Sequence, residues 1–299
     1  MRKPLEFKLY AITGEDYHPG RSMLDVMEAA LAGGADIVQL RDKKSPKAAV
    51  LEKAKALREL TSRYGVPFIV NDYPGIAHAV EADGVHLGQE DLSITEARAL
   101  LGPDAIVGIS THSIEQARAA QASGADYIGV GPVFPTGTKP GRQAVTTAYV
   151  RQAAAEIRIP WVAIGGITLD NADEVLAAGA TRLCAVAALV GSEDPRAAAW
   201  AFRERIAAAS LLSATTMAAQ ALKQGGGVGL AVPTITVRIN GRTESVAARN
   251  VAELVAAYGL GGRRIVAELD GEIVSRSAWE DTPLREGAVV ELVHFVGGG

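Results

Sequence analysis

A loop rich in glycine, proline, threonine and lysine runs from Gly131 to Gly141, directly after the apolar segment Tyr127–Val130. Prolines stiffen such a loop, and glycines let backbone N–H groups approach a ligand closely. The hydroxyls of Thr136 and Thr138 and the ammonium group of Lys139 can then donate to anionic oxygens. Glycine and proline alone favour an ordinary surface loop. The Thr-x-Thr-Lys sequence and the residues described below favour a phosphate-binding loop instead.

A second polar group is the segment Gln39-Leu40-Arg41-Asp42-Lys43, at the end of a predicted strand. Residues two apart in an extended segment point the same way, so Gln39, Arg41 and Lys43 are predicted to share one side. An isolated Arg-x-Lys pair is more often a solvated strand end. Two cations and an amide on one side nevertheless suit a phosphorylated heteroaromatic ligand.

Two aspartates, Asp72 and Asp91, follow the third and fourth predicted strands, and their loops are expected to be neighbours on one face. Each aspartate alone is typical of a helix N-cap or a turn. Together, beside phosphate-binding cations, they fit Mg²⁺, which keeps several waters and takes few protein ligands plus phosphate oxygens. A magnesium site is therefore predicted at these two loops.

Further polar residues lie at or near predicted strand ends. Ser110 follows the fifth strand and can donate to phosphate, whereas His112 is as consistent with a helix start as with a functional role. His86 lies within a strand, which favours a hydrogen-bonded core histidine. The loops after the seventh and eighth strands are expected to present backbone N–H groups to a second phosphate.

A repeated βα unit is expected to position these residues, because short apolar runs alternate with amphipathic, alanine-rich segments from Phe7 to about Val190. Eight parallel strands in this length predict an α/β fold, a (β/α)8 TIM barrel, closed by a helix at 195–209. An open doubly wound sheet is the alternative, and the barrel is favoured because polar residues follow nearly every strand. The predicted strands are Lys8–Ile12, Ile37–Leu40, Phe68–Asn71, Gly84–Leu87, Ile106–Ile109, Tyr127–Val130, Trp161–Ile164 and Leu183–Ala187.

Four of these strands are introduced by related phrases in which glycine or its neighbour ends a helix. The recurrence indicates an internal repeat. The phrases are Gly34-Ala35-Asp36, Ala82-Asp83-Gly84, Gly124-Ala125-Asp126 and Gly179-Ala180-Thr181.

The chain changes character after the predicted barrel of residues 1–209. Residues 210–232 are predicted to be a linker with a helical start and a glycine-rich end. Residues 235–239 then alternate apolar and polar side chains before Asn240-Gly241, a strong hairpin turn. A helix capped by Asn250, a hairpin at Asp270-Gly271 and a last strand at 288–295 follow. Residues 233–299 are therefore predicted to form a small α+β, ubiquitin-like β-grasp domain.

Composition excludes several classes of partner. The 299 residues carry a formal net charge of −4, so no basic field favours nucleic acid or an anionic membrane. The single cysteine, Cys184, excludes an internal disulfide and a multi-cysteine metal site. No uninterrupted apolar stretch is long enough for a membrane span. A cytoplasmic protein acting on small molecules is expected.

Five ordered motifs resemble thiamine-phosphate synthase over residues 7–192. The resemblance implies a diphosphate-releasing transferase that joins 4-amino-5-hydroxymethyl-2-methylpyrimidine diphosphate to thiazole phosphate, with Mg²⁺. The motifs are Gln39-Leu40-Arg41-Asp42-Lys43, Val70-Asn71-Asp72, the segment Asp83 to Asp91, the Gly131–Gly141 loop, and Ala163-Ile164-Gly165-Gly166-Ile167.

The resemblance also implies a role for each matching residue. Gln39 would bind the pyrimidine, and Asp72 and Asp91 would bind Mg²⁺. The family often has serine where Ala187 stands, which removes one hydroxyl donor but keeps the backbone N–H. The implied catalytic cations are Arg41, Lys43 and Lys139. The other implied substrate-binding residues are Leu40, Asp42, Asn71, Ser110, Thr136, Gly137, Thr138, Gly166, Val186 and Ala187.

The C-terminal segment resembles the sulfur carrier of the thiamine pathway, on the Asn240-Gly241 hairpin and the run Val290 to Gly299. Glycines such as Gly298 and Gly299 let a terminus enter a narrow enzyme site, where its carboxylate would be adenylated and converted to a thiocarboxylate. The implied partners are an adenylating enzyme and a separate thiazole synthase. A frayed glycine end is the alternative interpretation of the terminus alone.

Three functions remain open at this stage. The first is a bifunctional synthase and sulfur carrier. The second is a barrel of the thiazole tautomerase type with His112 as acid–base group, which need not keep the five charged residues Arg41, Lys43, Asp72, Asp91 and Lys139. The third is a non-catalytic scaffold whose tail docks partners.

Overall fold

The structure of the protein is a computed structural model, which describes the chain except residues 1–4, 137–143, 225–233, 259, 261–264 and 295–299. The chain divides into two compact units, Met1–Ser210 and Leu211–Gly299. The domain limits predicted from the sequence, 209 and 233, stay predictions.

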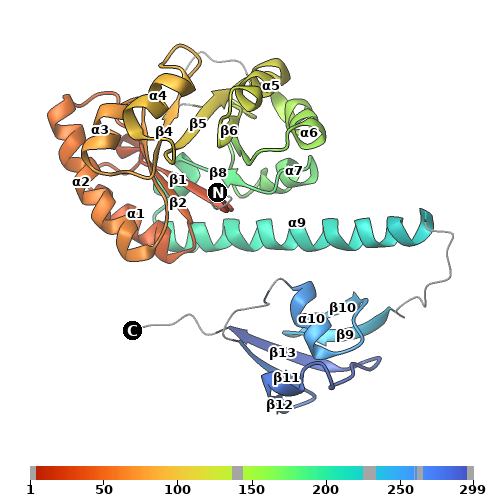
Figure 1. The fold of residues 1–299 in the computed structure, drawn as a ribbon. Coiled ribbons are helices and arrows are strands. Elements are labelled where there is room, and N and C mark those ends of the chain that lie inside the picture. Colours follow the sequence, from red (N-terminus) through yellow and green to blue (C-terminus); the bar gives the residue numbers. More distant parts are fainter. Residues whose placement is uncertain (1–4, 137–143, 225–233, 259, 261–264, 295–299) are drawn as a thin grey trace. The chain divides into compact units, whose positions relative to one another are not determined.

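The first unit contains a closed barrel of eight parallel strands with helices around it (Figure 1). The strands are β1 (Leu9–Ile12), β2 (Ile37–Leu40), β3 (Phe68–Asn71), β4 (Gly84–Leu87), β5 (Ile106–Thr111), β6 (Tyr127–Val130), β7 (Trp161–Ile164) and β8 (Leu183–Cys184). Cys184 on β8 pairs with Tyr10 on β1 and with Ile164 on β7, so the sheet closes on itself. The predicted (β/α)8 barrel is confirmed, and the open sheet is excluded.

The eighth strand is shorter than the sequence predicts. β8 ends at Cys184, and a one-turn helix, α8 (Ala187–Val190), begins where the predicted strand Leu183–Ala187 would end. Val186 already has helical backbone angles, φ −78° and ψ −72°, and its carbonyl accepts hydrogen bonds from the N–H groups of Leu189 and Val190. The end of this prediction is wrong because a short apolar run fits a buried strand and a buried helical turn equally well.

The helices pack their apolar faces on the outside of the barrel. Ser22, Ser93 and Ser113 cap three of them by accepting a hydrogen bond from a backbone N–H in the first turn. The elements are η1 (Glu15–Tyr17), α1 (Met23–Ala32), α2 (Lys47–Tyr64), α3 (Pro74–Ala79), α4 (Ile94–Leu101), α5 (Ile114–Ala122), α6 (Thr146–Glu156), α7 (Ala172–Ala177), α8 and α9 (Pro195–Gln224).

The repeated phrases seen in the sequence join each helix to the next strand. Gly34, Gly124 and Gly179 take φ values of 107°, 83° and 103°, which glycine adopts without strain. Three of the four repeated segments contain an aspartate, which accepts hydrogen bonds from backbone N–H groups at the preceding strand and pairs with an arginine. These contacts are Asp36 with Lys8, Leu9 and Arg203, Asp83 with Phe68 and Arg58, and Asp126 with Val107 and Arg98.

Two apolar layers hold the first unit together. The larger lies between the strands and the helices and includes Leu9, Val38, Leu40 and Phe68. The smaller fills the barrel and includes Phe7, Tyr10, Ile37, Ile69, Tyr127, Val162 and Cys184. Successive residues of β1 and β2 point alternately to these two layers, as expected for buried parallel strands.

The second unit contains a five-stranded sheet in the order β10-β9-β13-β11-β12, in which β9 and β13 are parallel (Figure 1). Asn250 caps the helix, and the turns Asn240-Gly241 and Asp270-Gly271 take the positive φ angles that their residues favour. The β-grasp prediction is confirmed. The elements are β9 (Ile235–Ile239), β10 (Arg242–Val246), α10 (Val251–Ala257), β11 (Ile265–Leu269), β12 (Glu272–Val274), η2 (Arg276–Ala278) and β13 (Val289–His294).

α9 is longer than the sequence predicts, because it continues from Ala209 to Gln224. This segment holds several strong helix formers and no glycine or proline, so nothing in it stops the helix. The predicted linker therefore begins as helix, and its glycine-rich end lies outside the described residues. No helix in the described part of the chain is long and apolar enough to cross a membrane. The cytoplasmic location stays a prediction.

Candidate active site

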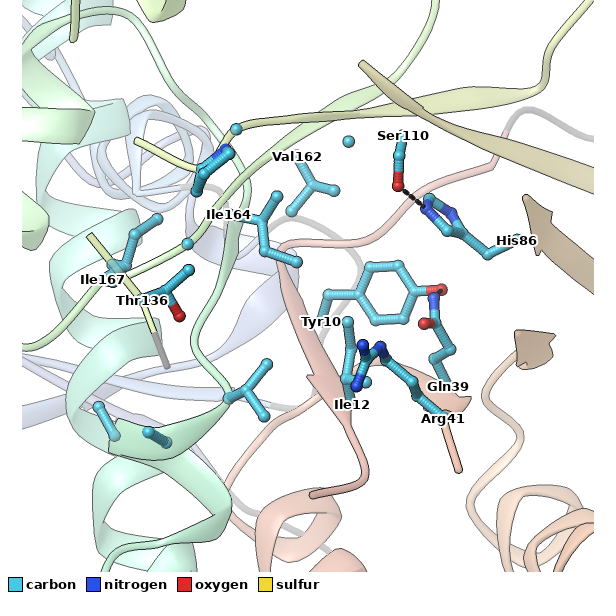
Figure 2. A pocket seen from close by; sticks show the side chains of 18 of the residues that line it. Tyr10, Ile12, Gln39, Arg41, His86, Ser110, Thr136, Val162, Ile164 and Ile167 are labelled. Atoms are coloured by element: carbon cyan, nitrogen blue, oxygen red, sulfur yellow. Dashed lines mark hydrogen bonds between the residues drawn. The ribbon is translucent and has the colours of Figure 1, made fainter. Parts of the chain in front are cut away.

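A pocket lies inside the barrel, and residues from or directly after all eight strands line it (Figure 2). The carboxyl ends of the strands and the loops after them are where barrel enzymes bind their substrates. Eight of the residues predicted from the sequence line this pocket: Gln39, Arg41, Asn71, Ser110, Thr136, Gly166, Val186 and Ala187. They lie far apart in the sequence, and the closure of the barrel brings them together.

The other predicted residues are not among those that line the pocket. Leu40 is buried in the outer apolar layer, as the alternation along β2 requires. Asp42, Lys43, Asp72 and Asp91 lie in the loops after β2, β3 and β4. Gly137, Thr138, Lys139, Gly298 and Gly299 lie outside the described residues. The roles of all these residues stay predictions.

Asp42 shapes the loop after β2. Its carboxylate accepts hydrogen bonds from the backbone N–H groups of Lys44 and Ser45 and from Lys53 Nζ, at 2.7–3.0 Å. Burial alone would raise the pKa of Asp42, but the hydrogen bonds from Lys53 and Ser45 outweigh it and hold the pKa well below its usual value. Lys53 also pairs with Glu15, so one lysine ties two loops at the mouth of the barrel.

Asp72 has an unusual backbone conformation directly after β3. Its φ is 60°, in the left-handed region that aspartate tolerates better than most residues. Its N–H donates to the carbonyl of His86, and its carboxylate lies 2.7 Å from Lys43 Nζ. The backbone of β4 and a lysine from the loop after β2 therefore hold this carboxylate at the barrel mouth.

Asp91 lies in the neighbouring loop after β4, where its carboxylate accepts a 2.6 Å hydrogen bond from the N–H of Gly88. The donor chemistry at these two loops fits Mg²⁺, which binds carboxylate oxygens and completes its shell with waters and phosphate. No group of three or more histidine, cysteine, aspartate or glutamate residues suited to a metal occurs in the described part of the chain. The two carboxylates would leave the rest of a Mg²⁺ shell to waters and to oxygens of a ligand.

A chain of side-chain hydrogen bonds crosses the interior of the barrel at the pocket. Gln39 Nε2 donates to the hydroxyl of Tyr10, which lies 2.7 Å from the hydroxyl of Tyr127. The Tyr127 hydroxyl lies 2.9 Å from His86 Nδ1, and His86 Nε2 lies 2.9 Å from Ser110 Oγ. Figure 2 shows the Gln39 amide at Tyr10 and the bond between His86 and Ser110.

No feature of the sequence indicates a role for Tyr10 or Tyr127. Both stand in apolar strand segments, where a tyrosine reads as ordinary core, and no motif marks their pairing. The sequence favours a hydrogen-bonded core histidine at position 86, and both ring nitrogens of His86 do contact protein side chains. It also lines the pocket, which the sequence did not indicate.

The sequence is consistent with His112 either at a helix start or at a functional site, and the structure shows features of both. It directly precedes Ser113, the N-cap of α5, and its N–H donates to the side chain of Gln116. It also lines the pocket, with ring Nδ1 in contact with the carbonyl of Gly131. This contact ties the imidazole to the first residue of the Gly131–Gly141 loop.

The loops after β6 and β7 pack together and leave no room for a side chain on Gly165 or Gly166. A Cβ on Gly165 would come within 2.5 Å of Pro132, and a Cβ on Gly166 would come within 2.7 Å of Pro135 and Phe134. Both glycines also take positive φ angles, 98° and 65°. The N–H groups of Val133 and Phe134 donate to carbonyls of the β7 end. The two loops therefore form one joined wall of the pocket.

These features define a class: a (β/α)8 barrel whose carboxyl-end face gathers an arginine, amides, hydroxyls and glycine loops around one pocket, as in barrels that bind phosphorylated small molecules. The model of the thiamine monophosphate synthase family matches residues 9–189, and the model of the ThiS family matches residues 237–299. The chain belongs to the thiamine monophosphate synthase family and carries a ThiS-family domain at its C-terminal end.

Individual relatives agree with this assignment. The thiamine-phosphate synthase of Halalkalibacterium halodurans is 58% identical over 190 residues, which are 63% of this chain and 90% of that protein. The thiamine-phosphate synthase of Thermus thermophilus is 50% identical over 192 residues, 63% of this chain and 92% of that protein. The solved structure of thiamine phosphate pyrophosphorylase from Pyrococcus furiosus is similar with a TM-score of 0.63 and 39% identity, covering 68% of this chain and 96% of that one.

Proposed function

We propose that this chain has two functions in thiamine biosynthesis. Its barrel is a thiamine-phosphate synthase that joins 4-amino-5-hydroxymethyl-2-methylpyrimidine diphosphate to thiazole phosphate and releases diphosphate. Its C-terminal domain carries sulfur as a thiocarboxylate for formation of the thiazole. The observation that carries the first half is the pocket lined by Gln39, Arg41, Asn71, Ser110 and Thr136 in a chain of this family.

The pocket offers different chemistry to the parts of the two substrates. Gln39 and the apolar side chains of Ile12 and Val162 suit a heteroaromatic ring. Arg41, Asn71 and Ser110 lie around it and suit the diphosphate of the same molecule. The loop after β7 and the start of α8 supply backbone N–H groups for the phosphate of the second substrate. Thr136 lies on the loop between these parts.

The reaction breaks the bond between the pyrimidine methylene carbon and the diphosphate oxygen and forms a bond from that carbon to the thiazole nitrogen. The amino group of the ring stabilises the methylene cation that remains when diphosphate leaves. Negative charge grows on the departing oxygens, so Arg41, Lys43 and Lys139 would lower the barrier by stabilising it. Both substrates carry phosphate, and a joined, stiff wall between their sites keeps them oriented for attack.

Asp72 and Asp91 would hold Mg²⁺ together with diphosphate oxygens. The bound ion would neutralise part of the leaving group's charge. The ion pair between Lys43 and Asp72 would then open, freeing the lysine for the same diphosphate.

The C-terminal domain would act through partners: an adenylating enzyme that activates Gly299 and a thiazole synthase that accepts the sulfur. The ThiS-family match and the five-stranded sheet support this role. A barrel of the thiazole tautomerase type, or a non-catalytic scaffold, is not favoured, because the family match and named relatives are synthases.

One sample of the full chain tests both halves. Incubation with both substrates and Mg²⁺ should yield thiamine phosphate and diphosphate in equal amounts. Incubation with an adenylating enzyme and a sulfur source should add the mass of one sulfur-for-oxygen exchange at the C-terminus. Absence of product would overturn the synthase, and an unchanged intact mass would overturn the carrier.

A further inference from the structure

Two tyrosine hydroxyls face each other 2.7 Å apart inside the barrel, Tyr10 from β1 and Tyr127 from β6. Both side chains are buried, with at most 1% of their surface exposed. Burial raises the pKa of both phenols, so each stays protonated and has one hydrogen to donate. Tyr10 lines the pocket, whereas Tyr127 is not among the lining residues.

When each hydroxyl passes its hydrogen onward, one direction runs through the whole chain from Gln39 to Ser110. Gln39 Nε2 can only donate, so Tyr10 accepts from it and keeps its own hydrogen for a bond to Tyr127. Tyr127 then gives its hydrogen to His86 Nδ1. A neutral imidazole that accepts at Nδ1 carries its hydrogen at Nε2, which donates to Ser110.

We propose that Tyr10 and Tyr127 are positioning residues that couple the two ends of the pocket, by fixing which group Gln39 and Ser110 each offer to a ligand. In the direction described, the Gln39 amide keeps its carbonyl oxygen as an acceptor. Ser110 accepts from His86 and can donate its own hydrogen. Turning the amide round would reverse every bond, so that Gln39 offered a donor and Ser110 offered a lone pair.

The direction that starts from the Gln39 donor suits one class of ligand, an aromatic amine that carries an anionic group. Its amine donates to the oxygen of Gln39, and its anionic oxygens accept from Ser110. The reversed direction would set two donors against each other at the ring and a lone pair against the anion. This inference rests on the proposed function and deepens it, because the aminopyrimidine diphosphate has both groups in one molecule.

The surrounding backbone holds Tyr127 in place. A Cβ on Gly108 of β5 would lie 2.1 Å from the Tyr127 ring, so the ring packs directly on the glycine backbone. Phe7 contacts both tyrosine rings edge-on, with centroids 5.7 Å and 6.0 Å away. The chain of hydrogen bonds from Gln39 through Tyr10, Tyr127 and His86 to Ser110, here called the relay, therefore has rigid supports on two sides.

The test compares Tyr127→Phe with Tyr149→Phe in the full chain. Tyr149 is also buried, and its hydroxyl lies 2.6 Å from Thr111 Oγ1, outside the relay and the pocket. Both variants remove one buried, bonded hydroxyl, so they match in their general cost to stability. Tyr10→Phe breaks the relay at the next member and serves as a second variant if Tyr127→Phe does not fold.

Two readouts are needed. Nitrogen-15 NMR of the His86 ring, without ligand and at a pH where the ring is neutral, should show Nε2 protonated in the wild type and in Tyr149→Phe, with the Nδ1–H form appearing in Tyr127→Phe. The KM for the pyrimidine diphosphate should rise about tenfold in Tyr127→Phe, as expected for one misdirected hydrogen bond. The KM for thiazole phosphate should stay unchanged.

An unchanged His86 ring in Tyr127→Phe, or the same KM change in Tyr149→Phe, would overturn the relay. The NMR arm needs no substrate, so it decides on the relay even if the wild type makes no thiamine phosphate. A wild type that makes no thiamine phosphate would overturn the proposed function and leave the relay untouched.

Discussion

Lys43 Nζ lies 2.7 Å from Asp72 Oδ2 and joins the loop after β2 to the loop after β3. The sequence assigned these two residues to different tasks, a cation for diphosphate and a carboxylate for Mg²⁺. The lysine side chain is 52% exposed and the aspartate 17%. A pair this exposed contributes about 0–1 kcal/mol to stability, so a ligand with more charge can separate the two at little cost.

Replacing Lys43 should therefore reduce turnover far more than stability. We expect Lys43→Met to lower kcat/KM about 100-fold, because one cation facing the departing diphosphate is lost, with little change in melting temperature. Lys44→Met is the matched control, since Lys44 directly follows Lys43 and pairs with Asp16 of η1, and both of these side chains are mostly exposed. Steady-state kinetics and thermal melting check both variants. Equal activity in the two would contradict the assignment of Lys43.

Asp72 can be tested with its backbone conformation preserved. Asparagine tolerates the left-handed φ of 60° that residue 72 adopts, whereas alanine would add strain. Asp72→Asn should raise the Mg²⁺ concentration for half-maximal activity about tenfold or more, because a charged ligand becomes neutral. Titration of the synthase reaction with Mg²⁺ measures this. An unchanged Mg²⁺ requirement would remove Asp72 from the metal site.

An added methyl group should lower stability at one glycine of the barrel, Gly108, and weaken substrate binding at another, Gly129. A Cβ on Gly108 would collide with the Tyr127 ring, so Gly108→Ala should cost about 1–3 kcal/mol in stability. A Cβ on Gly129 would lie 3.7 Å from His86 and 3.8 Å from Ile164, in ordinary contact, but in the pocket. Gly129→Ala should keep the melting temperature and raise the KM for the pyrimidine substrate. A stable Gly108→Ala with a normal pocket would contradict this packing.

The alternation of side chains along β2 was predictable from the sequence, whereas the residue at which the alternation ends was not. Gln39 and Arg41 line the pocket while Leu40 points to the outer layer, as the period of two requires. The same rule does not extend to Lys43, because β2 ends at Leu40 and the Asp42 carboxylate turns the chain by accepting two backbone N–H groups. A local pattern holds only as far as the extended backbone does.

Long-range pairing was beyond the sequence. The hydroxyls of Tyr10 and Tyr127 meet across 117 positions, and nothing in either segment distinguishes them from apolar core. The repeated Gly-Ala-Asp phrases, in contrast, were readable because glycine and aspartate have local roles at each helix-to-strand junction. Only closure of the barrel decides which polar strand residues face one another.

Acid should weaken the barrel partly through Asp42. Because hydrogen bonds depress its pKa in the folded state, the ionised carboxylate stabilises the fold above its unfolded pKa of about 3.9, and this contribution is lost as pH falls below that value. Asp42→Asn should lower the free energy of unfolding by about 1–3 kcal/mol near neutral pH. The gap between wild type and variant should narrow below about pH 4. Urea unfolding across this range measures it, and a gap that stays constant would contradict the role of Asp42.

Ala187 offers a gain-of-affinity test at the second phosphate position. Its side chain is exposed in the pocket at the start of α8. Ala187→Ser adds a hydroxyl donor at a place where the backbone N–H already remains, so the KM for thiazole phosphate should fall about three- to tenfold, as expected for one added hydrogen bond to an anion. The KM for the pyrimidine diphosphate should not change, because the residues proposed to bind that substrate, Gln39, Arg41, Asn71 and Ser110, belong to or directly follow β2, β3 and β5. Kinetics with each substrate varied in turn separate the two effects. A fall in both constants would mean that the hydroxyl acts on the shape of the whole pocket, and no fall in either would place the phosphate away from α8.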